Sequence, residues 1–191
     1  ALYDLAALHA ERDAVAHRLA THTSDVARCW ATQWVTLSGL PLAAQLEAVR
    51  RFAADPHFGV REFAWMAVRD AVGASPAEAL ALLQPWALDA DANIRRFASE
   101  LTRPRGVWCA QIDALKAEPW LALPLLEALR ADSSRYVQNS VANWLNDASK
   151  TQGPWVDQTC ERWLCESKSV ATRYIVQRAR RTLRKSSLVE P

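Results

Sequence analysis

The sequence predicts an all-α protein in which helical pairs stack side by side as a solenoid, an α-α superhelix. Four units carry an acidic or small residue five positions before a β-branched residue, which a polar or basic residue follows. They are Asp55…Val60-Arg61, Asp89…Ile94-Arg95, Asp132…Val137-Gln138 and Ser167…Thr172-Arg173. The units recur at intervals of 34, 43 and 35 residues, typical of helical pairs that bury their apolar faces only against neighbouring pairs. Only 5 residues are Gly, so the turns that β-hairpins need are scarce.

Apolar spacing and boundary residues predict the helices of the first half. Val26, Trp30 and Trp34 recur every four residues and predict a buried stripe. Pro41 suits the first turn of a helix, and Ser75-Pro76 is a helix-start signal. In the same way, Asp or Ser at the start of each unit is expected to cap a helix through its side-chain oxygen. The predicted helices cover residues 1–20, 21–37, 41–54, 58–72 and 76–88.

Proline and glycine divide the second half. The residue before a proline leaves helical geometry, so the helix that begins at Ala92 must end before Pro104. Gly153 and Pro154 break the chain between two later helices. The predicted helices cover residues 92–101, 108–115, 120–130, 133–150, 155–166 and 169–184.

Composition places the chain among globular proteins. Half of the residues are hydrophobic, which predicts a single domain over residues 1–191 with repeat units that start near residues 21, 55, 89, 132 and 167. The four cysteines form no CxxC pair and have no nearby His, so we expect reduced thiols, no bound metal and a cytoplasmic location; they are Cys29, Cys109, Cys160 and Cys165. No apolar run is long enough for a membrane span, and no secretory signal is recognisable.

The basic residues are clustered although the formal net charge is only +2. From Ser167 to Leu188 the chain has no acidic residue but several arginines and lysines, and a second basic group surrounds Arg95 to Arg105. Arginine predominates over lysine, which favours planar, bidentate partners such as phosphates. The plainer alternative is a solvated helix face followed by a basic tail.

Three carboxylates stand out because each has arginine or amide neighbours on its own predicted helix: Glu62, Glu100 and Asp147. Asn139, Asn143 and Asp147 are four residues apart and therefore lie in one row along a helix. Asn is a mediocre helix former, so helix stability alone does not account for this row. Each acid taken singly is equally consistent with an ordinary ion pair. Together they are expected to converge in the basic concave groove of the solenoid.

Residues 60–185 resemble a known family. The resemblance rests on Ala98-Ser99-Glu100, on Thr102-Arg103-Pro104-Arg105 with Trp108, on Tyr136-Val137, on Ser140-Val141-Ala142-Asn143 with Leu145-Asn146-Asp147 through Ser149-Lys150, and on Arg180-Arg181-Thr182-Leu183. These strings are similar to the AlkC and AlkD type of HEAT-like-repeat DNA alkylation-repair glycosylases, with the AlkC branch nearest. They span about two thirds of the chain and occur in the family's order.

The resemblance implies a monomeric glycosylase that needs no cofactor or metal. It would remove cationic alkylated bases such as 3-methyladenine from double-stranded DNA without flipping the base, in a bacterial cytoplasm and on the nucleoid when bound to DNA. The catalytic residues would be Asp147, Glu100, Glu62 and Trp108. The DNA-binding residues would be Arg61, Trp65, Arg95, Arg96, Arg103, Arg105, Asn143, Lys150, Arg173, Arg178, Arg181 and Lys185.

Several positions depart from the family pattern, and two other functions stay open. Leu101 stands where a Gly is common, Gln138 and Asn139 where basic residues are usual, and Trp144 where a His is common. We expect these changes to alter substrate range and DNA affinity more than the type of reaction. The alternatives are a catalytically silent paralogue that recognises DNA shape, and a protein-binding α-solenoid scaffold.

Overall fold

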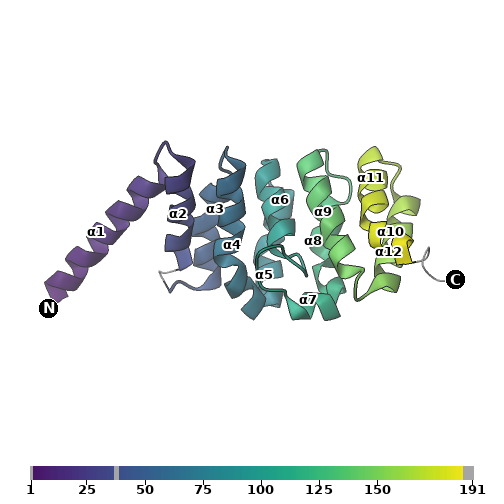
Figure 1. Ribbon diagram of the computed structural model, residues 1–191, viewed down its shortest axis with the longest axis horizontal. Helices are drawn as coiled ribbons and strands as arrows, with labels where there is room; N and C mark the ends of the chain where they lie inside the picture. The colour runs from purple at the N-terminus through teal and green to yellow at the C-terminus, as the bar shows by residue number, and fades with distance from the viewer. Residues whose placement is uncertain (1, 37–38, 187–191) are drawn as a thin grey trace. The chain divides into compact units, whose positions relative to one another are not determined.

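The computed structural model describes residues 2–36 and 39–186, and within them it confirms the all-α prediction. The described residues form α-helices and short 3₁₀ helices with no β-strand (Figure 1). The chain divides into two compact units, Ala1–Val68 and Arg69–Pro191, with the boundary inside α4. The expectation of a single domain remains a prediction.

The first unit consists of α1 (Leu2–Ala20), α2 (Asp25–Thr36), α3 (Leu42–Ala53) and the first part of α4 (Phe58–Ala74). α2 contacts α1 and α3. The predicted stripe on α2 is wrong at Val26 and Trp30, which are exposed; the buried positions include Cys29, Thr32 and Val35. These three positions are three residues apart. Because an α-helix has 3.6 residues per turn, residues at this spacing stay on one face of a short helix.

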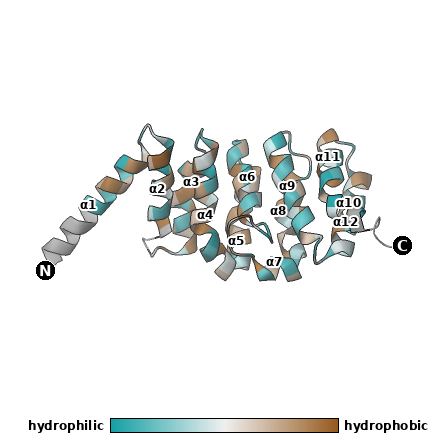
Figure 2. Ribbon diagram, viewed as in Figure 1, coloured by the Kyte–Doolittle hydropathy of each residue, from teal (hydrophilic) through white to brown (hydrophobic). Residues whose placement is uncertain are grey.

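The second unit contains the rest of α4 and the following elements: α5 (Pro76–Leu83), η1 (Pro85–Leu88), α6 (Ala92–Leu101), α7 (Asp113–Ala117), η2 (Pro119–Ala122), α8 (Leu123–Leu129), α9 (Arg135–Ala148), α10 (Gly153–Glu166), α11 (Val170–Ala179) and α12 (Arg181–Ser186). Helices α6, α9 and α11 lie in a row with α9 in the middle (Figure 1), and α8 and α10 pack against them. Fully buried side chains between these layers include Leu101, Leu129, Trp144 and Trp163. Both hydrophobic and hydrophilic residues occur along each of these helices, as Figure 2 shows.

The repeated sequence unit is a structural device at the start of each row helix. In the unit before α6, the Asp89 side chain accepts a hydrogen bond from the backbone N–H of Asp91 at 2.8 Å. Arg95, six residues after Asp89, donates to the Asp89 carbonyl at 2.8 Å. The same guanidinium also reaches forward to both carboxylate oxygens of Asp132 in the next unit, at 2.6 and 3.0 Å. Arg95 therefore closes its own loop and joins it to the following repeat.

Other units vary this device. In the first unit of the chain Arg28 donates to the His22 carbonyl and to Asp55, with Nε 2.7 Å from Asp55 Oδ2. In the repeat that starts near residue 132, Gln138 replaces the arginine and still donates to the Asp132 carbonyl at 2.7 Å. The recurring Asp side chain accepts from the backbone N–H two residues later in three of these repeats and so fixes the loop before the helix. The helix cap expected at Asp89 is instead Asp91, whose side chain accepts from Asn93 N–H.

Several predicted helices differ from the structure; residues 76–88, for example, divide into α5 and η1. Residues 108–112 are not helical, because Arg69 binds the carbonyls of Leu101, Arg103 and Ala110 and holds the chain as a loop. The predicted helix 169–184 divides at Arg180 into α11 and α12. There the Asn146 side chain of α9 donates to the Ala179 carbonyl at 3.0 Å. This bond satisfies a carbonyl at the C-terminal end of α11.

The loop-joining role of Arg95 predicts a loss of stability on its removal. Arg95→Met deletes the ion pair to buried Asp132 and two carbonyl contacts, and we expect the free energy of unfolding to fall by about 2–3 kcal/mol. Urea unfolding followed by circular dichroism measures it. Arg162→Met is the control: its partners, Glu127 and Glu166, are more exposed, so its loss should be much smaller. Equal losses for both variants would contradict this role.

Candidate functional site

A single guanidinium joins two of the three predicted catalytic carboxylates. Arg103 Nη1 donates to Glu100 Oε1 at 2.6 Å, while Nε and Nη2 donate to Asp147 Oδ2 at 2.9 and 2.6 Å. The residues are buried, with Glu100 6% and Asp147 3% exposed. Glu100 lies in the last turn of α6 and Asp147 in the last turn of α9. The structure therefore brings together two acids from successive repeats.

The remaining carboxylate oxygens also have partners. Glu100 Oε2 accepts from Ser140 Oγ at 2.7 Å and lies 3.4 Å from Arg96 Nη2. Asp147 Oδ1 accepts from Lys150 Nζ at 3.1 Å, and the Lys150 side chain is 44% exposed. We call Glu100, Asp147, Arg103, Arg96, Lys150 and Ser140 the Arg103 cluster. With three cations around two carboxylates, its formal charge is positive.

The apolar stripe of α9 determines where Asp147 lies. Four apolar residues on one face of α9 are fully buried: Val137, Val141, Trp144 and Ala148. The Trp144 indole N–H also donates to the Thr102 carbonyl at 2.9 Å, just after α6 ends. This bond ties α9 to the segment that carries Arg103. The Trp that replaces the family's usual His is thus part of the scaffold of the cluster.

Electrostatics hold Glu100 in its ionised form. Burial by itself raises the pKa of Glu100, but the charges of Arg96 and Arg103 and the hydrogen bonds from Ser140 and Arg103 outweigh it, so the pKa is lowered. Burial likewise lowers the pKa of Arg103, and the two carboxylates more than offset this effect and raise it. The salt bridge is therefore fully charged at neutral pH.

The predicted asparagine row contacts α11 and α12. Asn143 Oδ1 accepts from Arg181 Nη2 at 3.0 Å, and Asn139 Oδ1 accepts from the Tyr174 hydroxyl at 2.7 Å. The guanidinium carbons of Arg135 and Arg178 lie 3.6 and 5.5 Å from the centre of the Tyr174 ring. Within the described residues, neither guanidinium forms an ion pair with a carboxylate. Two stacked arginines without counter-charges are suited to bind phosphates.

Arg135 was missed in the sequence. Its side chain is exposed at the first turn of α9. Its position four residues before Asn139 places it on the same helix face as the asparagine row, and this spacing is the signal that could have identified it.

Trp108 and Arg105 lie in the loop that follows α6. Trp108 is 90% exposed and has a positive φ of 65°. Arg105 Nη1 donates to Gln111 Oε1 at 3.2 Å, within the same loop. Arg96, by contrast, stands over the Tyr136 ring at 4.7 Å to the ring centre. The exposed Trp108 indole is open to contact with a ligand, and it is joined to Arg103 of the cluster by the short segment between them.

Other predicted residues lie elsewhere or have structural partners. Glu62 belongs to the first unit, where it accepts from the Trp65 indole at 2.9 Å, and its convergence with the other two acids stays a prediction. Trp65 is only 4% exposed, which does not favour direct contact with DNA. Arg61 donates to the Asp55 and Pro56 carbonyls.

Two of the remaining arginines bind the backbone of their own repeat, and the side chain of the last predicted residue is not described. Arg95 is engaged by Asp132, and this does not favour its predicted role in binding DNA. Arg173 is exposed and donates to the Lys168 carbonyl at 2.6 Å. The side chain of Lys185 lies outside the described residues.

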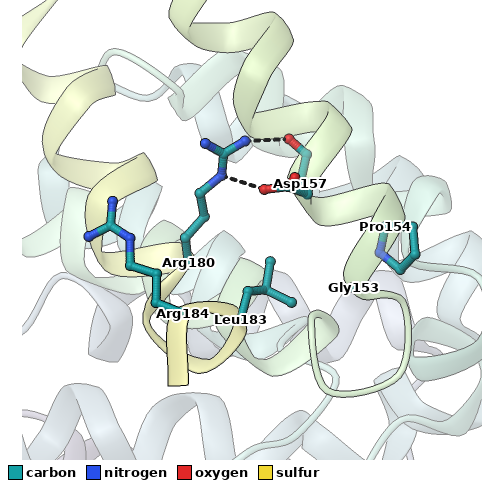
Figure 3. Close-up of a pocket in the computed structure, with 6 residues that line it drawn as sticks. All are labelled: Gly153, Pro154, Asp157, Arg180, Leu183 and Arg184. Atoms are coloured by element: carbon teal, nitrogen blue, oxygen red, sulfur yellow. Dashed lines mark hydrogen bonds and ion pairs between the residues drawn. The ribbon is translucent and has the colours of Figure 1, made fainter. Parts of the chain in front are cut away.

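A separate open cavity of about 510 Å³ lies between α10 and α12 (Figure 3). Its lining includes Arg180, Asp157 and Arg184 but no member of the Arg103 cluster. Arg180 Nε is 2.7 Å from Asp157 Oδ1, and Nη2 donates to the Asp157 carbonyl at 2.8 Å. This arginine is therefore neutralised within the cavity.

The described residues contain neither a candidate metal site nor a candidate membrane-spanning helix. Among the residues that the structure describes, no group of three or more His, Cys, Asp or Glu side chains is arranged to hold a metal ion. The four cysteines are free thiols. In the described ranges no helix combines the length and apolar character needed to cross a bilayer.

The lowered pKa of Glu100 predicts a specific pH dependence. Because the folded-state pKa lies below the unfolded value of about 4.3, the ionised group stabilises the fold above that pH, and this contribution is lost as the pH falls through the folded pKa. The gap in unfolding free energy between the parent and Glu100→Gln should therefore be constant near neutrality and shrink in acid. Urea unfolding at a series of pH values measures it. A gap that is the same at every pH would contradict the assignment.

Comparison with known sequences gives one curated relative. The protein YhaZ of Bacillus subtilis, described as uncharacterised, is 36% identical over 144 residues. The match covers 75% of this chain but 39% of the relative, so the chain spans less than half of that protein's length. No protein-family model matches the chain.

Two solved structures are similar. The Pseudomonas fluorescens alkylpurine DNA glycosylase AlkC, bound to DNA that contains an abasic site analog, is 30% identical with a TM-score of 0.66; the match covers 82% of this chain and 43% of AlkC. AlkD2 from Streptococcus mutans is 24% identical with a TM-score of 0.73. The match covers 90% of this chain and 80% of AlkD2, and it shows a shared fold. The chain therefore belongs to the AlkC and AlkD type of HEAT-like-repeat DNA alkylation-repair proteins, and its resemblance is to the AlkC branch.

Proposed function

We propose that this chain is a DNA N-glycosylase that releases cationic alkylated bases, of the 3-methyladenine type, from duplex DNA. The observation that carries the proposal is the pair of buried carboxylates, Glu100 and Asp147, joined by Arg103. The likeness to AlkC, whose solved structure is bound to DNA, supports the same function.

The chemistry needs little from the protein beyond electrostatics. A cationic alkylated base leaves without being protonated, so the enzyme has to stabilise positive charge on the deoxyribose and place a water molecule. Carboxylates at the sugar perform both tasks, as they do in glycoside hydrolysis. Because the base itself needs no acid, contacts to the sugar suffice, and the proposal includes action without base flipping.

Asp147 is the better placed of the two acids for direct contact. Its Oδ2 is fixed by two nitrogens of buried Arg103, whereas its Oδ1 is bound by the exposed ammonium of Lys150. A DNA phosphate would compete with Asp147 for the Lys150 ammonium. When Lys150 moves to the phosphate, Asp147 Oδ1 can accept a hydrogen bond from water or face the sugar. Glu100 supports Arg103 from the other side.

The phosphates would be held by basic side chains on the same row of helices. Arg135 and Arg178 stack on Tyr174, and Arg181 is held by Asn143. Trp108 would place its ring against the cationic sugar, an attraction of about 0.5–2 kcal/mol. Arg105, Lys150 and Arg173 complete the proposed contacts.

One observation favours the alternative of a silent DNA-binding paralogue. Every oxygen of Glu100 and Asp147 already has a partner in the structure. If these bonds persist on DNA, no carboxylate is available for water.

Removal of the Asp147 charge tests the catalytic proposal. In Asp147→Asn we expect the single-turnover rate of base release from methylated duplex DNA to fall at least about tenfold with little change in DNA affinity, because the charge acts on a cation that forms in the transition state. Asp157→Asn, at a carboxylate outside the cluster, should retain the parent rate. Circular dichroism checks that both variants are folded.

The parent chain decides between the two functions in the same assay. DNA binding without base release by the parent would establish the silent binder and refute the glycosylase.

Salt dependence tests the phosphate contacts. Arg135→Gln and Arg178→Gln should each weaken DNA binding and reduce the slope of log affinity against log salt by about 0.9, the value for one phosphate contact. Arg162→Gln, at an arginine already paired with Glu127 and Glu166, should leave the slope unchanged. Fluorescence anisotropy with a labelled duplex at several salt concentrations measures it. Parent binding that is insensitive to salt would exclude phosphate contacts.

A further inference from the structure

A buried arginine anchors the loop that carries Trp108. We define the Trp108 loop as residues 102–112, between α6 and α7. Arg69, near the end of α4 and 1% exposed, donates to the carbonyl of Leu101, to that of Arg103 at 2.6 Å and to that of Ala110 at 3.2 and 3.1 Å. One side chain therefore ties down both ends of the loop.

Burial of the Arg69 guanidinium is costly, and its hydrogen-bond partners are backbone carbonyls. Among the described residues, no carboxylate is hydrogen-bonded to Arg69, and burial lowers the pKa of its guanidinium. A buried cation without a carboxylate partner is normally unfavourable. The carbonyls at the negative C-terminal end of α6 offset part of this cost. A hydrophobic side chain would fill the same space without the cost of burying a charge, but it could not bind the loop carbonyls. We therefore attribute to the Arg69 cation the fixing of the loop.

The loop itself is under steric constraint. Trp108 has a positive φ, which is uncommon for a bulky residue, and its indole is exposed. The Ile112 N–H donates to the Pro104 carbonyl at 3.0 Å and closes the loop. At Gly106 an added Cβ would lie 2.2 Å from Cys109 Sγ, so this turn has no room for a side chain while the thiol is present.

We propose that Arg69 is a positioning residue that fixes the Trp108 loop, so that Trp108 and Arg103 stand in one arrangement toward a bound ligand. The proposal rests on the proposed function in so far as the ligand is the sugar–phosphate chain of alkylated DNA. Arg103 connects the loop to the carboxylates, because its carbonyl is bound by Arg69 and its side chain by Glu100 and Asp147. Arg69 acts through these residues and touches no substrate itself.

The first test changes Arg69 and observes Trp108 directly. Arg69→Lys keeps the charge but replaces the three-nitrogen fork by one ammonium. The protein is labelled with fluorotryptophan, and the fluorine resonance of Trp108 is assigned with Trp108→Phe. We expect the Trp108 resonance of the free protein to shift or broaden in Arg69→Lys, while that of buried Trp163 is unchanged. Base release should fall roughly tenfold or more with DNA affinity retained.

The second test moves the loop without changing Arg69. Gly106→Ala should displace the Trp108 resonance and slow base release, because the new Cβ collides with Cys109 Sγ. Cys109→Ala alone should have neither effect. The double variant Gly106→Ala/Cys109→Ala should restore both readouts, since the remaining neighbours of the Cβ, Arg69 Nη2 and Cζ, are at 3.5 and 3.6 Å.

The outcomes separate positioning from general stability. A lower unfolding midpoint in Arg69→Lys with an unmoved Trp108 resonance would show a purely structural role and overturn the proposal. If Gly106→Ala changes neither the Trp108 resonance nor the rate of base release, the proposal that the loop is fixed is also overturned. If the parent releases no alkylated base, the proposed function fails, while the resonance measurements still decide whether Arg69 positions Trp108.

Discussion

The bond network of Arg103 is the interaction on which the candidate site depends. Its three guanidinium nitrogens hold carboxylates from two successive repeats, at distances of 2.6 to 2.9 Å. Removal of Arg103 would leave two buried like charges close together, and removal of either acid would leave a buried cation with unsatisfied donors. Glu100 and Asp147 are therefore energetically coupled through Arg103, and substitutions at the three positions will not be additive. The site is one unit assembled by repeat stacking.

The two ends of the row helices use carboxylates differently. Asp89 and Asp132 precede the N-termini of α6 and α9, where a negative charge is favoured by the helix dipole, and they join the loops. Glu100 and Asp147 stand at the C-terminal ends of the same helices, where the dipole opposes a negative charge. They persist there only with Arg96, Arg103 and Lys150 around them. A local arrangement that works against stability is typical of a functional site.

The sequence was sufficient to predict the features that follow from its repeats and from helical spacing. The unit interval predicted stacked helices, and the arginine neighbours of Glu100 on its predicted helix left open an ordinary ion pair, which the structure contains between Glu100 and Arg103. Asp147 is 44 residues from Arg103, so only packing of the repeats could bring them together. Charge alone does not reveal a partner, and the structure gives Arg95, predicted to bind DNA, an ion pair with Asp132. Its recurrence six residues after an acid marks it as part of the repeat. The structure of the Trp108 loop could not be predicted, because it depends on hydrogen bonds from Arg69. Nothing in the sequence around Arg69 indicates these partners, which lie more than 30 residues away.

The different surroundings of the two acids assign them different roles. Glu100 is held by Arg103, by Ser140 and by Arg96, all of which are buried. Moving any of these donors would break the packing between α6 and α9. Asp147 shares Arg103 but otherwise depends on Lys150, whose side chain is exposed and free to adopt other rotamers. A polyanion at this face attracts Lys150 more strongly than it can attract a buried guanidinium, so the oxygen released first is Asp147 Oδ1. Under the proposed function, the negative charge needed opposite a cationic sugar would thus become available when DNA is bound, and Glu100 would maintain the geometry of Arg103 while this happens.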